Sequence, residues 1–242
     1  MRVLFTLQYL GTRYAGWQTQ TNATAVQAVF ESALGRMFHT TVRVEGAGRT
    51  DSGVHARAQK AHADLPFSID LPGLQRGLND LLPADIRVAS VENVADDFHC
   101  RFQAKSKTYR YQIWNAPFAD VFTAETHAHL PMPLDASRMH AAAQSLTGAH
   151  DFAAFTVAAP EVSSTVRTVE SIVVERAEDV LSIVVSADGF LRFMVRRIAG
   201  SLIEIGRGRI APEMLARSLE PSFEPARWTA PAKGLTLWQI RY

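Results

Sequence analysis

The sequence has one cysteine and lacks a long apolar segment, and both features narrow its class. Cys100 has no second cysteine to pair with, which excludes an internal disulfide and a cysteine-based zinc cluster. No run of about 18 apolar residues occurs, so no membrane-crossing helix is expected. Near the start, Gln8, Thr12 and Arg13 interrupt the apolar stretch that a signal peptide would need. We therefore expect a cytoplasmic protein.

Charge is low overall but unevenly distributed. The 242 residues are 47% hydrophobic and 20% charged, which excludes a disordered chain and fits one large domain or two packed ones. The formal net charge is only +1, yet 101–111 carries four basic residues and no acidic one, and 36–60 and 192–209 are also basic. Such segments, mixed with aromatics, indicate a face for an anionic ligand. The alternative is an ordinary set of solvated strand and helix faces.

The hydrophobic spacing predicts an α+β fold. In the first half we expect strands at 3–9, 41–45, 58–65, 86–92 and 106–115, and helices at 25–37, capped by Asn22 or Thr24, and 71–81. In the second half we expect helices at 135–147, 190–205 and 212–219, and strands at 171–176, 180–187 and 235–242. This succession fits two ferredoxin-like (RRM-like) halves, 1–115 and 116–242, that share a mostly antiparallel sheet.

The most polar segment is the glycine-rich loop Gly46–Ala56. Its glycines allow a tight backbone that approaches a ligand, and Asp51 is held among Arg49, His55 and hydroxyl groups. Asp51 stands where a dinucleotide fingerprint needs its third glycine, so that interpretation is poor. A turn whose side chains bond its own backbone remains the structural alternative.

Two further segments could serve a nucleic-acid ligand. In the strand over 107–113, Tyr109 lies on one side and Arg110 on the other, and stacking on a base is worth about 1–3 kcal/mol. Two core tyrosines are the alternative. Arg196 lies beside the apolar stripe of the helix at 190–205, where it either extends to solvent or pairs with a carboxylate such as Asp51.

The sequence predicts no metal site and no hydrolase triad. The histidines at 127 and 129 and the cluster 96–99 lack the spacing of helical metal motifs. Ser52 and His55 share a loop, but no nucleophile-elbow motif accompanies them.

Several segments together resemble the tRNA pseudouridine synthase A (TruA) family, in the same order and at similar separations along the whole chain. They are Tyr9–Gln20, Gly48–Ala56, Leu78–Pro83, Asp97–Ala104, Lys107–Tyr111, Phe190–Leu202 and Ala230–Leu235. The resemblance implies a pseudouridine synthase fold and a cofactor-free isomerase. Such an enzyme converts uridine to pseudouridine at positions 38, 39 and 40 of the tRNA anticodon stem-loop, and it works as a homodimer.

The resemblance also implies roles for individual residues. Asp51 matches the catalytic aspartate, taken here as the nucleophile, Arg196 the basic residue that pairs with it, and Tyr109 the tyrosine that stacks on the target base. Arg49 matches a position that handles the flipped nucleotide. The remaining RNA contacts expected from the basic segments are Arg101, Lys107, Arg110 and Arg197.

The chain departs from the family pattern at a few positions. Leu10 stands where aspartate is usual, and Arg192 and Phe193 stand where histidine or glutamine is frequent, so RNA contacts there can differ. Two other classes fit some of the same residues. A non-catalytic RNA-binding module would use the basic and aromatic strand but gives no role to Asp51. A carboxylate-dependent hydrolase would use Asp51 but does not need three basic segments.

Overall fold

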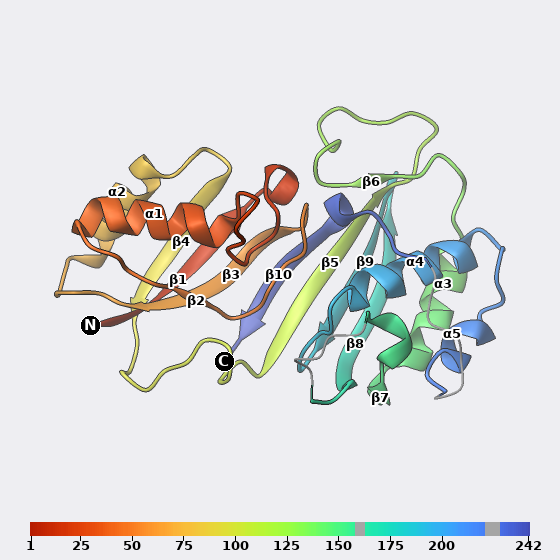
Figure 1. Cartoon of the computed structure of the whole chain (residues 1–242). Helices are drawn as coiled ribbons and strands as arrows, with labels where there is room; N and C mark the ends of the chain where they lie inside the picture. Colours follow the sequence, from red (N-terminus) through yellow and green to blue (C-terminus); the bar gives the residue numbers. More distant parts are fainter. Residues whose placement is uncertain (158–162, 221–227) are drawn as a thin grey trace. The chain divides into compact units, whose positions relative to one another are not determined.

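The computed structural model describes residues 1–157, 163–220 and 228–242 (Figure 1). Packing divides the chain into unit 1, Met1–Lys105 with Leu237–Tyr242, and unit 2, Ser106–Thr236. The division of the chain into functional halves at residues 115 and 116 stays a prediction.

Unit 1 contains an antiparallel sheet centred on strand β1 (Arg2–Tyr9). This strand pairs with β3 (His55–Asp64) and with β4 (Ile86–Asn93). The two-residue strand β2 (Glu45–Gly46) pairs antiparallel with β3, and β10 (Leu235–Arg241) follows β3 in the strand order. Alternate residues of β1 are buried, as the period of two predicts.

Helices α1 (Val26–Phe38) and α2 (Leu71–Leu81) pack on each other and cover the apolar face of this sheet, and the 3₁₀ turn η1 (Gly11–Arg13) follows β1. Phe30 of α1 meets Phe5 of β1 edge to face, with ring centroids 5.0 Å apart. The α2 bounds are those predicted, and the Asp70 side chain caps the helix by accepting from the Gly73 amide at 2.7 Å.

The predicted cap of α1 is wrong. Neither Asn22 nor Thr24 caps the helix, because Ala25 occupies the N-cap position. The amides of Val26 and Gln27 instead donate to the main-chain carbonyls of Gly16 and Trp17, at 3.1 and 3.0 Å. Backbone from the loop between β1 and α1 therefore does the work of a capping side chain.

The strand predicted over 41–45 is mostly absent, since only Glu45 and Gly46 join the sheet. Val44 is buried, but its backbone bonds side chains of α1. Its carbonyl accepts from Gln27 Nε2 at 3.1 Å, and its amide donates to Glu31 Oε1 at 3.0 Å. The apolar pattern predicted burial correctly. No strand forms at Val44 because its backbone groups bond to side chains of α1 and not to a neighbouring strand.

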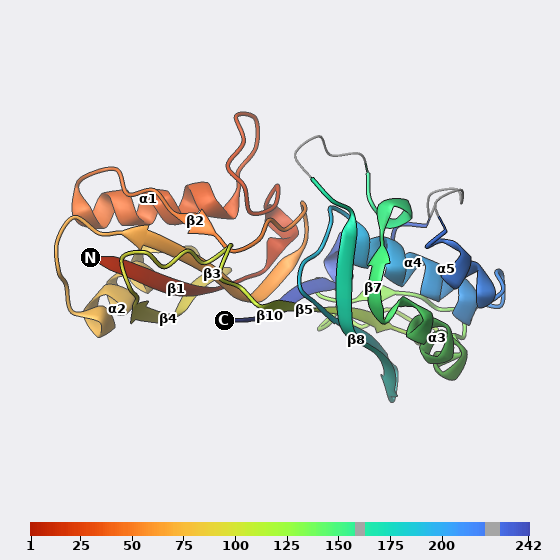
Figure 2. The ribbon, with the colours of Figure 1, turned by 90° about the horizontal axis from the view of Figure 1, so that it is seen from below.

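In unit 2, β5 (Ser106–Trp114), β9 (Val180–Ala187), β8 (Val166–Ala177) and β7 (Gly148–Asp151) pair in that order, each antiparallel to the next. Figure 2 shows the long strand β8 passing beside β7. The short strand β6 (Ala128–His129) pairs parallel with the end of β5. Strands β6 and β7 were not predicted, because so few residues show no clear alternation.

The helices of unit 2 are α3 (Ala136–Ala143), α4 (Met194–Gly206) and α5 (Glu213–Arg217), with 3₁₀ turns η2 (Gln144–Leu146), η3 (Ala153–Phe155) and η4 (Ala232–Gly234). The predicted start of a helix at 190 is wrong, because Phe193 has a left-handed backbone (φ 65°) and α4 begins after it. Within the described ranges, no helix combines the length and the apolar character needed to span a membrane.

Candidate active site

The glycine-rich loop Gly46–Ala56 is held by the segment that follows β1. The Trp17 amide donates to the Thr50 carbonyl at 3.1 Å, and the Gly53 amide donates to the Tyr14 carbonyl at 3.2 Å. The Ser52 hydroxyl also donates to the Tyr14 carbonyl, at 3.3 Å. Backbone bonds therefore fix the loop on both sides of Asp51.

Two glycines make this close approach possible. Gly16 has φ +90°, and a Cβ there would overlap the Thr50 carbonyl oxygen. A Cβ on Gly11 would overlap the Val54 carbonyl oxygen. Only glycine fits where two backbones meet in this way. Gly11 and Gly16, in the segment after β1, therefore allow the glycine-rich loop to pack against that segment.

A buried hydrogen bond links the loop to the end of β1. The hydroxyls of Tyr9 and Thr50 lie 2.9 Å apart, and both side chains are less than a tenth exposed. Burial raises the pKa of the Tyr9 phenol, so the phenol stays neutral and can donate or accept a hydrogen bond. The Tyr9 ring also stacks on Trp17, with centroids 6.3 Å apart.

Asp51 itself is half-buried, at the point where the loop turns. Its carbonyl accepts from the Val54 amide at 3.1 Å, which tightens the turn that carries the carboxylate. Such a side chain on a fixed backbone is suited to act as a base or a nucleophile on a ligand brought to it.

His55 has a structural role in the same loop. It is buried, and its Nδ1 accepts from the Gly11 amide at 2.9 Å, which ties β3 to the turn after β1. This nitrogen is therefore occupied, and the bond gives no support to a Ser52–His55 nucleophile pair.

Gln59 belongs to this assembly and was missed by sequence reasoning. It is fully buried on β3, and its Nε2 donates to the Gly48 carbonyl at 2.7 Å. Gln59 is a polar residue on the buried face of a strand, four residues after His55. A buried polar side chain needs a hydrogen-bond partner, and this is the signal that could have identified Gln59 from the sequence.

Tyr109 lies on β5 of unit 2, opposite Val185 on β9. It is 7% exposed, and its ring meets Phe190 edge to face with centroids 5.0 Å apart. Its neighbour Tyr111 is fully buried and donates to the Pro231 carbonyl at 3.0 Å. The strand thus carries one tyrosine at the margin of the core and one within it.

Arg196 is in the first turn of α4 and is held by two bonds to one residue. Its Nε donates to the Ala230 carbonyl at 2.9 Å, and its carbonyl accepts from the Ala230 amide at 3.0 Å. The guanidinium carbon lies 5.1 Å from the Phe193 ring centroid, and Arg192 makes a matching contact at 5.1 Å. A left-handed phenylalanine is costly, and such strain is typical of residues that position a functional group. The sequence showed Phe193 only as a departure from the family pattern.

The predicted RNA-contacting residues differ in their surroundings. Arg49 and Arg101 are exposed, and Arg101 lies over the Phe102 ring at 5.8 Å. Arg110 donates to the Ser182 hydroxyl at 3.1 Å, while Lys107 on the same strand is half-buried.

Arg197 is half-buried and bonds to main-chain carbonyls. Its Nη1 donates to the carbonyls of Ala154 and Thr156, at 3.2 and 2.6 Å, and burial lowers its pKa. Arg49 and Arg101 share unit 1 with Asp51, whereas the other three share unit 2 with Tyr109 and Arg196.

Comparison with known proteins identifies the family of this chain. A family model described as tRNA pseudouridine synthase matches residues 6–103 and 142–242. Curated proteins named tRNA pseudouridine synthase A are similar over the whole chain. The Bacillus pumilus protein is 42% identical, covering all of this chain and 99% of its own length. The Pelobacter propionicus protein is 42% identical over 99% of each chain, and the Myxococcus xanthus protein is 41% identical over all of this chain and 92% of its own length. This chain therefore belongs to the tRNA pseudouridine synthase A family of isomerases.

Proposed function

We propose that the enzyme converts uridine to pseudouridine at positions 38, 39 and 40 of the tRNA anticodon stem-loop, with Asp51 as the catalytic nucleophile. The observation that carries this proposal is the loop 46–56, in which Thr50 and Gly53 are bonded to the backbone of Trp17 and Tyr14. This fixed loop presents one carboxylate in a segment that matches the family's catalytic motif.

The reaction places three demands on the protein. The first is to break the bond between ribose C1′ and uracil N1 and to form a bond between C1′ and uracil C5. The second is to remove the proton from C5 and supply one to N1, and the third is to keep the detached ring in the pocket while it turns. A carboxylate that can attack the nucleotide and be released again meets the first demand, because it splits one difficult step into easier ones. No redox change occurs, so we expect no cofactor.

Tyr109 and Arg196 take the remaining roles in this proposal. Stacking on Tyr109 would hold the uracil, and its edge-to-face contact with Phe190 supports a fixed ring orientation. Pairing with Arg196 would keep Asp51 ionised when the site closes around its substrate. The bonds of Arg196 to Ala230 support this role, because they hold the guanidinium in place.

For RNA binding, we propose contacts to the tRNA backbone from Arg49, Arg101, Lys107, Arg110 and Arg197. The exposure of Arg49 and Arg101 supports their assignment. The bonds of Arg197 to Ala154 and Thr156 instead support a role in shaping unit 2 beside any contact with RNA. We also propose a cytoplasmic homodimer built from two ferredoxin-like halves per chain, from the family resemblance.

The test is release of tritium from tRNA whose uridines are labelled at C5. Unmodified tRNA should lose label at positions 38–40 in the presence of the wild-type enzyme, and substituting these three uridines should abolish the release. Mapping by primer extension after modification of pseudouridine checks the positions. Release from other sites only would overturn the assigned specificity.

A further inference from the structure

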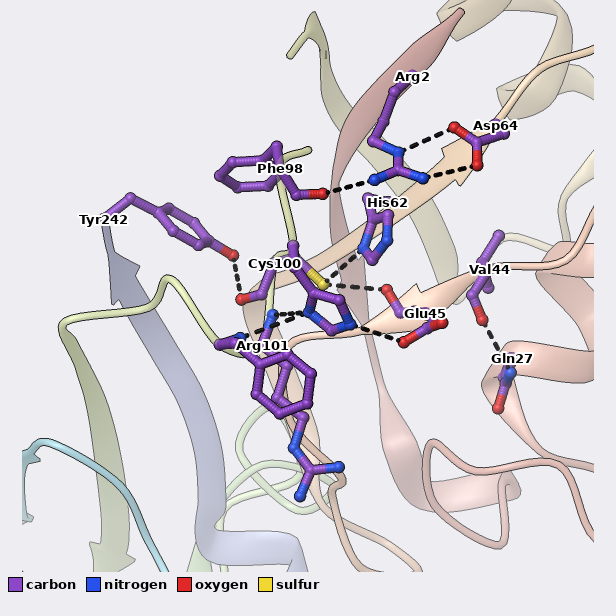
Figure 3. Close-up of polar contacts among 12 residues, drawn as sticks. Arg2, Gln27, Val44, Glu45, His62, Asp64, Phe98, Cys100, Arg101 and Tyr242 are labelled. Atoms are coloured by element: carbon purple, nitrogen blue, oxygen red, sulfur yellow. Dashed lines mark hydrogen bonds and ion pairs between the residues drawn. The ribbon is translucent and has the colours of Figure 1, made fainter. Parts of the chain in front are cut away.

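Three potential metal-binding side chains meet on unit 1, apart from the glycine-rich loop. Glu45 comes from β2, His62 from β3 and His99 from the turn after β4, and one ligand atom of each lies within 4.8 Å of the others. Figure 3 shows Glu45 and His62 with Cys100 beside them. Glu45 and His62 are direct cross-strand partners, so their side chains share a face of the sheet.

The contacts within the cluster are close. His99 Nε2 lies 3.0 Å from Glu45 Oε2, and the rings of His99 and His62 have centroids 4.8 Å apart. His62 Nδ1 lies 3.2 Å from the Cys100 thiol, which donates at 3.1 Å to the main-chain carbonyl of Glu45. The thiol thus orients the His62 ring, as outer-shell partners orient metal-binding imidazoles.

The surroundings of His62 favour the form that binds metals. Burial, together with the nearby His99 and Arg2, lowers the pKa of His62, which favours its neutral imidazole. The charge of Arg2 is compensated, since its Nε and Nη2 each lie 2.8 Å from a carboxylate oxygen of Asp64. The Arg2 guanidinium is therefore a weak obstacle to a cation at the cluster.

From this arrangement we propose that Glu45, His62 and His99 bind one Zn²⁺ ion, with Cys100 as a positioning residue for His62. Two imidazoles and a carboxylate form a known zinc donor set that leaves a fourth position to water. Ligand atoms on one tetrahedral ion lie about 3.3–3.5 Å apart, from bond lengths of about 2.0–2.2 Å. The ligand atoms, now within 4.8 Å of one another, must approach by up to about 1.5 Å. The Glu45 side chain is 67% exposed and can adjust to the ion.

Binding has a definite cost at His99. The amides of Arg101 and Phe102 donate to Nδ1 at 3.2 and 3.4 Å, so the neutral ring carries its proton on Nε2. Coordination through Nε2 shifts that proton to Nδ1 and exchanges two long hydrogen bonds for bonds to water. Both donors belong to exposed residues, so water can replace the ring nitrogen.

The ion would join three segments that the chain separates. It would tie the turn that carries Arg101 and Phe102 to the paired strands β2 and β3. We therefore expect zinc to stabilise unit 1, and the proposal is independent of the proposed catalytic role of Asp51.

The test is zinc titration of the whole protein after chelator treatment, read by calorimetry and by competition with a zinc-binding dye. Wild type should bind one Zn²⁺ per chain. Its melting temperature should rise by roughly 5–10 °C at a zinc concentration about 100-fold above Kd. Glu45→Gln and His99→Gln should each weaken binding at least about 100-fold, because loss of an outer-shell partner alone costs about 10–100-fold.

His39→Asn is the matched control, because His39 is exposed at the end of α1 and asparagine tolerates its left-handed backbone. It should leave zinc affinity unchanged. Cys100→Ala should weaken binding about 10–100-fold, and Cys100→Ser should restore much of it by keeping a hydrogen bond to His62. Circular dichroism of the zinc-free variants checks folding. Absence of one-to-one binding, or equal binding by wild type and His99→Gln, would overturn the proposal.

Discussion

The hydroxyl group of Tyr9, at the end of β1, lies 2.9 Å from the hydroxyl group of Thr50, directly before Asp51. Both side chains are buried, so neither group has water as a ready substitute. Through this bond the first strand of the chain helps to set the position of the candidate catalytic carboxylate.

Tyr9→Phe should therefore lower turnover while tRNA affinity stays near wild type. Loss of one partner leaves the Thr50 hydroxyl without its bond and should cost about 1–3 kcal/mol of stability, measured by urea unfolding. Tyr14→Phe is the control, since it also removes the hydroxyl of one buried tyrosine, and that hydroxyl donates to Asp85 at 2.7 Å. Equal turnover in the two variants would show that the bond to Thr50 does not position Asp51.

Gly16→Ala should abolish turnover, because its Cβ would overlap the Thr50 carbonyl oxygen and displace the loop. Gly208→Ala separates this overlap from backbone strain. Gly208 also has a positive φ, +72°, but among the residues that the structure describes, no atom beyond its local backbone lies within 4 Å of its added Cβ. Single-turnover rates should be normal for the Gly208 variant. A Gly16 variant with normal rates would contradict the assigned packing of the loop.

Asp51→Asn should remove turnover and leave tRNA affinity close to wild type. The substitution keeps the shape of the side chain but removes its charge and nucleophilicity. A loss of about 10⁴-fold corresponds to roughly 5–6 kcal/mol of transition-state stabilisation. Asp80→Asn, an exposed carboxylate on α2, should behave as wild type. Single-turnover assays beside filter binding measure both effects, and an active Asp51→Asn enzyme would refute the assignment.

Tyr109→Leu should lower turnover strongly, whereas Tyr109→Phe should change tRNA affinity only slightly. Many backbone contacts hold the RNA, whereas one ring would hold the target base. Because Tyr109 is only 7% exposed and touches Phe190, thermal unfolding must be measured beside the kinetics. A Leu variant that loses stability but keeps its turnover would mark Tyr109 as a packing residue.

Arg101→Ala should weaken tRNA binding and reduce the salt dependence of the binding constant by about 0.7–0.9 in log–log slope. Arg101 is exposed in a basic segment, so its loss would remove one proposed phosphate contact without disturbing the core. Arg138→Ala on α3 makes the same charge change on an exposed residue outside the basic segments. Identical slopes for the two variants would remove Arg101 from the proposed RNA surface.

Elements with strong local signals were predicted well. Helix α2 has the predicted bounds because Asp70, Pro72 and a clear apolar stripe all act within its own segment. Membership of the family was also readable, because motifs keep their order and spacing whatever the chain does in space.

Predictions failed where distant partners decided the outcome. The cap of α1 comes from carbonyls of Gly16 and Trp17, and the backbone of Val44 bonds to α1 instead of a strand. Helix α4 begins at Met194 and not at residue 190, because Phe193 has a left-handed backbone. The apolar stripe of the sequence continues through Phe193 and gives no sign of that conformation. Periodicity reports which residues are buried, but not which group satisfies each backbone amide.

The sequence by itself determined the α+β class, most of the helices and strands, the family and the candidate role of Asp51, because these depend on local propensity or on the order of motifs. Only the tertiary structure joined Tyr9 to Thr50 and brought Glu45, His62 and His99 together. Spacing along the chain indicated no metal site around His99, because the other residues of the proposed site lie on other strands. Hydrogen bonds and metal coordination act over a few ångströms, so they depend on which strands pair, and pairing is set by the packing of the whole sheet.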